Sequence, residues 1–374
     1  MAKRQTSMDS TTSSLLASAA TMSVRLSRKP SLLRRVELDD VVTVTPIIVP
    51  AEGEVIAVEV LSTLNRWAMI EDTTGHISDL VEGDIVAAVL AKRRSFQVFN
   101  CDIPSRLSPG NTLSYVSKSG IVGVVEASLN DTEIPVQVRV LGSILKAGAP
   151  VNIKHSAIPR CQTLSESAPI VVVAGTASNT GKTTTARNII QHLKSRGLRV
   201  AGAKLSGVAL WGELRCLAAT GADLVLGFAD GGLPTTCGNP TEVVEVSLGI
   251  LRELNKINPD VIVVEFGSCL LGFYNIMTVL DSPQFRQHVA SLVLTASDTV
   301  AAWGLKRLME EHKIDITLVT GPVVNNITYV GYIERELDLP AESNTGPMPK
   351  TFQLIDARLN EIGSETAKTE MAFL

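Results

Sequence analysis

The chain has 374 residues, of which 45% are hydrophobic and 19% charged, and its formal net charge at pH 7 is −4. This length allows two domains with large apolar cores, and the composition excludes a chain that is disordered throughout. The weakly acidic balance gives no reason to expect nucleic acid as a partner, and no apolar run reaches the roughly 20 residues of a membrane span, so we expect a soluble protein without a membrane partner.

Residues 1–35 are rich in Ser, Thr and Ala and carry many basic residues against a single acid, Asp9. Such a segment buries too little apolar surface to order itself, so we predict a disordered basic tail. The same composition is typical of an organelle transit peptide, which is the alternative interpretation.

Five cysteines are scattered along the chain without any C-x-x-C pair: Cys101, Cys161, Cys216, Cys237 and Cys269. An odd, unpaired set favours a reducing compartment and argues against a zinc site. We therefore expect a cytoplasmic protein, unless residues 1–35 direct it to an organelle.

Residues 41–145 form a β-rich segment without a long helical pattern. Seven candidate strands alternate with turn signals such as Pro109-Gly110-Asn111; they cover residues 41–49, 54–61, 67–71, 84–90, 112–116, 121–126 and 136–141. Many short strands predict a small barrel or sandwich. Lys92, Arg93 and Arg94 follow one strand and can face an anionic ligand, although a solvated strand end is the simpler explanation.

Residues 146–168 contain Gly148, Pro150, Pro159 and a Ser-rich stretch, which indicates a linker before a second domain at residues 169–374. That domain opens with the apolar run Ile170 to Val173, typical of a buried parallel strand. A loop of small residues follows and leads into a helical pattern that ends at Gly197.

The loop between strand and helix has the composition of a phosphate-binding loop. Gly175 and Gly181 enclose five residues, one more than the usual four: Thr176, Ala177, Ser178, Asn179 and Thr180. Glycines allow backbone N–H groups to turn toward phosphate oxygens, and the helix N-terminus adds partial positive charge. Lys182 can bridge the outer phosphates, and Thr183 can ligate Mg²⁺ through its hydroxyl. We expect Thr184, with the residues of the loop, to take part in binding the phosphates.

The rest of the second domain alternates strands and helices. Strands are predicted at residues 200–205, 261–264, 292–295 and 316–319, and helices at 211–219, 242–256, 300–311 and 352–362. This alternation predicts an α/β fold, a parallel sheet with helices on both faces. Ligands of such sheets bind beyond the C-terminal ends of the strands.

Polar residues follow three of the other strands. Lys204 can meet a transferring phosphoryl group, and Glu265 supplies the carboxylate that Mg²⁺ requires, although an acid in this position can also cap the next helix. Asn325 can read the edge of a base with its amide, and a turn-forming Asn is an equally good account. Asp298 is most simply the N-cap of the following helix. Nothing in the spacing of Asp223 and Asp230 specifies a substrate site.

Residues 169–330 resemble the dethiobiotin synthetase group within the class of P-loop proteins that includes the signal-recognition and Min-type proteins. The resemblance lies in Gly175 to Thr183, in Lys204-Leu205-Ser206-Gly207, in Val264-Glu265 before Gly267, and in Gly321 to Asn325. It implies binding of ATP and Mg²⁺, with Lys182 and Lys204 flanking the transferring phosphate. It also implies that Thr183 and Glu265 lie near the metal and Asn325 near adenine.

Three functions are consistent with these patterns. The first is a Mg²⁺-dependent ATP enzyme, of ligase or kinase type, that activates a small carboxylate or carbamate by phosphoryl transfer, with Lys182 and Lys204 as catalytic residues. The second is a nucleotide-switched accessory ATPase or GTPase for cofactor or metal insertion, with the β-rich domain holding the client. The third is an acyltransferase that holds coenzyme A by its phosphates. The expected partners are the nucleotide and a small acid, and a homodimer is one option.

Overall fold

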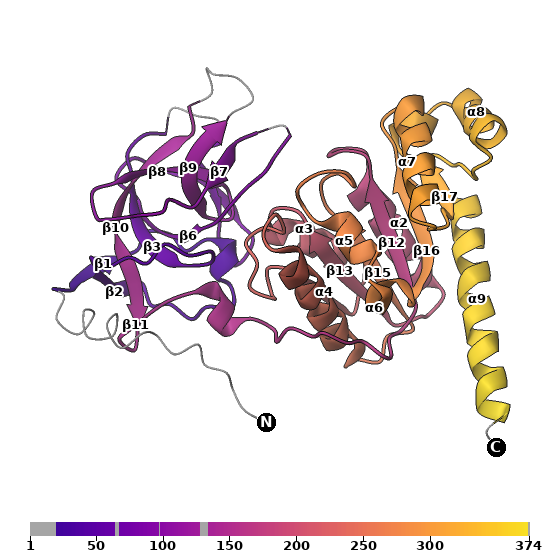
Figure 1. Ribbon diagram of the computed structural model, residues 1–374, viewed down its shortest axis with the longest axis horizontal. Helices are drawn as coiled ribbons and strands as arrows, with labels where there is room; N and C mark the ends of the chain where they lie inside the picture. Colours follow the sequence, from indigo (N-terminus) through magenta and orange to yellow (C-terminus); the bar gives the residue numbers. More distant parts are fainter. Residues whose placement is uncertain (1–19, 64–66, 97, 128–133, 373–374) are drawn as a thin grey trace. The chain divides into compact units, whose positions relative to one another are not determined.

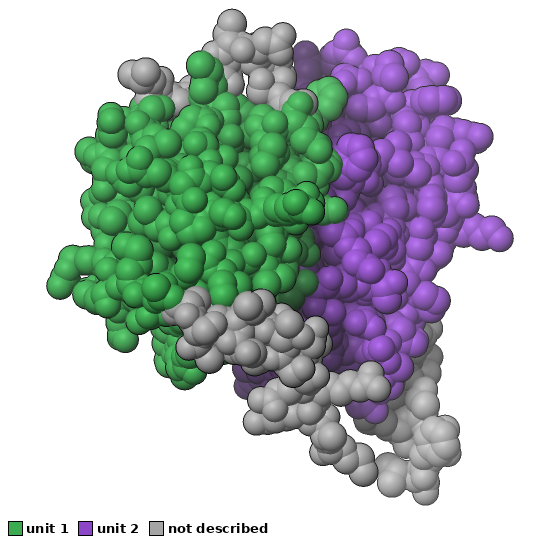
Figure 2. Space-filling view, turned by 60° about the vertical axis from the view of Figure 1, so that its left-hand side comes forward, with its two compact units in different colours: residues 1–157 green, residues 158–374 purple. Residues whose placement is uncertain are grey.

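The computed structural model describes residues 20–63, 67–96, 98–127 and 134–372 (Figure 1). The chain divides into two compact units, residues 1–157 and 158–374, which are coloured separately in Figure 2. The division falls within the segment 146–168 that the sequence indicates as a linker. Within the described residues, none of the helices is both long and apolar enough to cross a bilayer.

The prediction of a disordered tail at residues 1–35 is wrong from Met22 onward. Residues 1–19 lie outside the described part of the chain. Met22–Arg25 forms strand β1, which pairs antiparallel with β2 (Val41–Thr45). Ser31–Leu33 forms a buried 3₁₀ turn. Val24 and Leu26 are buried, and they alternate with polar residues that point to the other side of the strand. This alternation is too short to change the average composition of the segment, on which the prediction was based.

Unit 1 is a closed β-barrel. Strand β10 pairs with β3, β3 with β6, β6 with β9, β9 with β8, and β8 with β10 again, so the ring has no free edge. These strands span β3 (Val55–Val60), β6 (Ile85–Leu90), β8 (Thr112–Ser117), β9 (Ile121–Ala127) and β10 (Val136–Lys146). The predicted choice between barrel and sandwich is thus decided in favour of a barrel.

The barrel interior is apolar. Side chains from all the strands of the ring meet in one core, among them Ile56, Val86, Leu113, Val122 and Val138. Burial of these side chains supplies the main stabilising free energy of the unit.

Further short elements complete unit 1, and they differ in part from the predicted strands. Strand β10 continues beyond the predicted end at Leu141 because Gly142 accommodates a shift of register; a Cβ atom there would lie 2.6 Å from the carbonyl oxygen of Thr45. The remaining elements are β4 (Met69–Glu71), β5 (Ile77–Asp79), β7 (Asn100–Asp102), β11 (Ala149–Pro150) and a 3₁₀ turn at Ile153–Ser156.

Unit 2 is built on a six-stranded sheet in which every neighbouring pair is parallel, as predicted. The order is β14-β13-β15-β12-β16-β17. The bounds are β12 (Ile170–Gly175), β13 (Val200–Ser206), β14 (Leu224–Gly227), β15 (Val261–Phe266), β16 (Val289–Thr295) and β17 (Leu318–Thr320).

The helices of unit 2 lie between successive strands along the chain, except for the last two, which follow β17. They are α2 (Lys182–Ser195), α3 (Trp211–Ala218), α4 (Pro240–Asn255), α5 (Ile276–Leu280), α6 (Pro283–Arg286), α7 (Thr299–Glu311), α8 (Ile327–Leu337) and α9 (Pro349–Ala372). The sequence did not predict α8, because Gly331 and several β-branched residues lower its helix propensity. It also missed β14, α5 and α6, which are too short for a periodic pattern to emerge.

Helices cover the sheet so that its strands are buried on both sides. Val171 and Val173 of β12 belong to a core shared with α2 and Ile355 of α9. Ile170 and Val172, which alternate with them and therefore point to the opposite face, are equally buried. Burial on both faces explains the continuous apolar runs that predicted a parallel sheet.

Candidate phosphate-binding site

The loop at residues 175–181 follows β12 in the interior of the sheet. From β12 the chain crosses over β15 to β13, whereas from β15 it crosses over β12 to β16. Connections that leave in opposite directions open a crevice at the C-terminal edge of the strands, where ligands of such sheets bind. Gly175 fits there because a Cβ atom at this position would lie 2.0 Å from Oγ1 of Thr295.

The backbone of the loop has the shape of an anion cradle. Asn179 has φ 63° and Gly181 has φ 88°, and Gly181 is the N-cap of α2 without a side-chain hydrogen bond to the first turn. Thr180 is buried and fixes the loop through its Oγ1 atom, which lies 2.6 Å from Oγ1 of Thr295 and 2.9 Å from the carbonyl oxygen of Ala177. The N–H groups at the start of α2 are therefore available to a bound anion.

Three other residues predicted to bind phosphate are exposed: Ser178, Asn179 and Thr184. A fourth, Thr176, is partly buried, and its Oγ1 atom accepts a 3.3 Å hydrogen bond from the backbone N–H of Ser297. Ser178, Asn179 and Thr184 are thus at the surface of the protein.

Lys182 lies inside the cradle. Its side chain is buried, and its ammonium group donates a hydrogen bond to the carbonyl oxygen of Ala177. Burial lowers the pKa of Lys182 to about 8; the nearby carboxylate of Glu265 partly opposes this shift, while the ammonium group of Lys204 adds to it. Among the described residues the ammonium group of Lys182 is found bonded to a carbonyl oxygen and in no ion pair with a carboxylate, so a phosphate group can serve as its anionic partner.

Thr183 and Glu265 meet beside the cradle. Oγ1 of Thr183 donates a 2.7 Å hydrogen bond to Oε1 of Glu265. Glu265 is 2% exposed, and its Oε2 atom has no hydrogen-bond partner among the described residues. A buried carboxylate oxygen without a partner is costly, so this atom needs a ligand. A carboxylate next to a hydroxyl is an oxygen donor set that suits Mg²⁺, and the residues therefore fit this metal.

Lys204 is also buried, with its ammonium group in an ion pair with Glu213. Burial alone would lower the pKa of Lys204, but the carboxylates of Glu213 and Glu265 outweigh it, and the pKa is raised. Gly267 leaves the space for this side chain, because a Cβ atom at Gly267 would lie 2.9 Å from Cε of Lys204. The structure thus gathers Lys182, Lys204 and Glu265 into one electrostatic cluster.

Asn325 lies apart from this cluster, in the turn after β17. It lines a cavity of about 460 Å³ together with Ser343, Thr345 and Lys350, and its Oδ1 atom accepts a 3.4 Å hydrogen bond from Ser343. The cavity is concave and has polar groups of both donor and acceptor type.

Other residues considered from the sequence have structural roles. Asp298 caps α7 through a 2.9 Å hydrogen bond from the N–H of Ala301, as predicted. Asp223 accepts hydrogen bonds from Val200 and Lys194, and Asp230 accepts one from the N–H of Gly227. In unit 1, Arg94 forms an ion pair with Asp102.

Sequence reasoning missed two residues of the site, Glu213 and Asn344. Glu213 lies in α3 and contacts Lys204, whereas Asn344 lies between α8 and α9 and contacts the start of α2. Neither belongs to a motif, and no pattern in the chain signals them.

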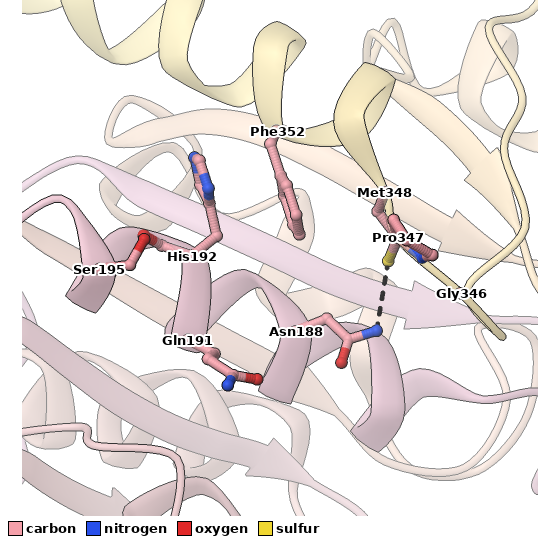
Figure 3. Close-up of a pocket in the computed structure, with 8 residues that line it drawn as sticks. All are labelled: Asn188, Gln191, His192, Ser195, Gly346, Pro347, Met348 and Phe352. Atoms are coloured by element: carbon pink, nitrogen blue, oxygen red, sulfur yellow. Dashed lines mark hydrogen bonds between the residues drawn. The ribbon is translucent and has the colours of Figure 1, made fainter.

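A second cavity, of about 410 Å³, lies between α2 and α9 (Figure 3). The rings of His192 and Phe352 stack there with centroids 4.1 Å apart. Asn188 projects from α2 toward the sulfur atom of Met348. This cavity lies on the flank of the helix and includes none of the residues predicted to bind phosphate or metal.

No protein-family model and no curated protein matches the chain. Several solved structures resemble part of it. Chloroplast FtsY from Physcomitrella patens is 19% identical with a TM-score of 0.35, over 53% of this chain and 67% of its own. Cell division protein FtsY from Thermotoga maritima is 18% identical with a TM-score of 0.36, over 54% of this chain and 71% of its own.

Signal recognition particle 54 kDa protein from Aeropyrum pernix, described in complex with GDP, is 16% identical with a TM-score of 0.36, over 54% of this chain and 50% of its own. None of these three structures is described as a dethiobiotin synthetase. In unit 2 the strand β12, the cradle and the helix α2 follow one another along the chain, and the strand belongs to a parallel sheet.

Proposed function

We propose that the protein binds a nucleoside triphosphate with Mg²⁺ in unit 2 and hydrolyses it, and that the nucleotide state controls an accessory role of the barrel. The single observation that supports this most is the buried Oε2 atom of Glu265, which has no hydrogen-bond partner among the described residues. The other oxygen of the same carboxylate accepts a hydrogen bond from Thr183, in the first turn of α2, and the N-cap of that helix, Gly181, has no side chain to cap it. A metal-bound triphosphate supplies both the cation and the anion that these groups lack.

In this proposal each residue has a defined task. The N–H groups of residues 176–184 and the ammonium group of Lys182 hold the outer phosphates, and Lys182 exchanges the carbonyl oxygen of Ala177 for a phosphate oxygen. Thr183 and Glu265 hold Mg²⁺, which neutralises charge on the phosphates when bound. Lys204 stabilises the negative charge that develops during cleavage.

We place the base in the cavity beside Asn325, whose amide can pair with a purine edge. The sequence pointed to ATP, whereas GDP is the nucleotide in the Aeropyrum structure, so both purines are candidates. Among the described residues that line this cavity, the one carboxylate is that of Glu342, and both of its oxygens accept hydrogen bonds from residues 350 and 351.

A second candidate function is phosphoryl transfer to a small acid. It is favoured by the two buried ammonium groups of Lys182 and Lys204, since two cations can stabilise a phosphoryl group between two anionic partners. In the first proposal, in which the nucleotide state controls the barrel, one of these two ammonium groups is sufficient for nucleotide binding.

The test measures thermal shift with ATP, GTP and acetyl-CoA, each with and without Mg²⁺, followed by phosphate release. We expect Mg²⁺-dependent stabilisation by a nucleoside triphosphate and steady hydrolysis without added acid. Phosphate release only upon addition of a small carboxylic acid would instead establish phosphoryl transfer. Stabilisation by acetyl-CoA alone, indifferent to Mg²⁺, would refute both in favour of an acyltransferase.

A further inference from the structure

Asn344 ties the phosphate-binding loop to a distant part of the chain. Its Nδ2 atom donates to the carbonyl oxygen of Gly181 at 3.2 Å and to Oγ1 of Thr185 at 2.9 Å, although Gly181 is 163 residues away in sequence. Asn344 is 6% exposed, so these hydrogen bonds are shielded from water. A Cβ atom at Gly181 would lie 2.4 Å from Nδ2, so the two residues are in close contact.

The segment that carries Asn344 is itself held in place at both ends. On one side, Pro340 and Glu342 form hydrogen bonds with the backbone of Val319 in β17. On the other side, the carboxylate of Glu342 accepts hydrogen bonds from the N–H groups of Lys350 and Thr351 at the start of α9. Asn344 therefore reaches Gly181 from a rigid support.

A third contact joins the same segment to the flank of α2. The carbonyl oxygen of Asn344 accepts a 3.4 Å hydrogen bond from Nδ2 of Asn188, the residue that Figure 3 shows pointing toward Met348. Asn344 thus contacts α2 at its N-cap, in its first turn and one turn later. These contacts fix the orientation of the N–H groups that face the cradle.

We propose that Asn344 is a positioning residue for the phosphate-binding loop, which sets the geometry of the cradle without contacting the nucleotide. The inference rests on the proposed function. Ser343 and Thr345, its neighbours, line the cavity of Asn325, whereas the Asn344 side chain is directed to Gly181. Its effect is therefore exerted on phosphate binding and not on the base.

The test compares Asn344→Leu, which removes the donors at nearly constant volume, with the native chain in binding Mg²⁺-tripolyphosphate, Mg²⁺-ATP and Mg²⁺-GTP. Tripolyphosphate has no base, so it reports on the cradle alone. We expect the affinity for tripolyphosphate and for the preferred nucleotide to fall by the same factor, about tenfold, at a temperature where circular dichroism shows a folded chain.

The matched control is Asn239→Ala, which removes the side-chain cap of α4, a helix that carries no residue of the site. It should lower the melting temperature and leave both affinities unchanged. Should Asn344→Leu fail to fold, Thr185→Val removes one of the two acceptors and is expected to weaken tripolyphosphate binding in the same way.

Unchanged tripolyphosphate affinity in these variants would overturn the inference, and so would a loss confined to the nucleotides, because it would place Asn344 in the base site. If the native chain binds neither tripolyphosphate nor any nucleotide, the proposed function fails, and this inference fails with it. The binding of tripolyphosphate and nucleotides by the native chain therefore shows which of the two proposals has failed.

Discussion

Oγ1 of Thr183 and Oε1 of Glu265 are joined by a 2.7 Å hydrogen bond, across 82 positions of sequence. Thr183 lies in the first turn of α2 and Glu265 is the penultimate residue of β15, which is the direct neighbour of the strand that precedes the cradle. The hydroxyl group donates to one carboxylate oxygen, and the other oxygen has no hydrogen-bond partner among the described residues. We propose that this pair of residues binds Mg²⁺.

Replacement of Glu265 by Gln should weaken the Mg²⁺ dependence of triphosphate binding. Because the amide carries no negative charge, we expect Mg²⁺ affinity in the ternary complex to fall about 10- to 100-fold. Isothermal titration with and without Mg²⁺ measures this effect. The control is Asp260→Asn, which neutralises an acid just before the opposite end of the same strand. Full Mg²⁺ dependence in Glu265→Gln would assign the metal to other groups.

Triphosphate affinity should depend on pH through Lys182, whose pKa burial lowers to about 8. The free chain loses the Lys182 proton as the pH rises through 8, whereas a bound phosphate holds it, so affinity falls by up to about tenfold per pH unit above 8. Binding measured from pH 7 to 10 tests this linkage. Lys182→Arg stays charged over this range and should show no such fall, and a parallel decline in both proteins would rule Lys182 out as its source.

Lys204→Ala should spare nucleotide binding and reduce turnover by about 10²- to 10³-fold, because its cation acts on charge that develops in the transition state. Lys182→Ala should weaken binding as well. Steady-state kinetics together with equilibrium binding separate the two. Lys194→Ala, which removes a lysine paired with Asp223 at the surface, is the control. An equal loss of binding in Lys182→Ala and Lys204→Ala would show that Lys204 holds the ground-state phosphates.

Glu54 makes the barrel sensitive to pH. Burial raises the pKa of Glu54 to about 7, partly opposed by the hydrogen bond from Ser143. The folded chain holds this proton between about pH 4.5 and 7 while the unfolded chain has lost it, so the free energy of unfolding falls as the pH rises through this window.

Glu54→Gln keeps the acceptor for Ser143 and abolishes this titration. We expect the variant to match the native chain near pH 4 and to exceed its stability by about 3 kcal/mol at pH 8. Hydrogen exchange of the β3 and β10 amides across this range reports on the barrel within the full chain. A constant difference between the two proteins from pH 4 to 8 would refute the assignment.

The local order of strand, cradle and helix could be predicted from the sequence because each step has a local cause. The β-branched run of Ile170 to Val173, the glycines and the apolar spacing of α2 act over a few residues. The same holds for the parallel sheet and for the cap at Asp298. In contrast, β1 was missed because its four residues are stabilised by pairing with β2 and by burial of Val24, which are contacts with other parts of the chain.

The tertiary structure alone decided which distant residues come into contact. Examples are the closure of the barrel through β8 and β10, the ion pair of Lys204 with Glu213, and the contact of Asn344 with Gly181. Strand order and loop geometry bring these groups together, and neither leaves a periodic trace in the chain. Sequence alone determined which chemical groups the cradle contains; the fold determined which of them are buried, paired or left for a ligand, because burial and pairing are properties of neighbours in space.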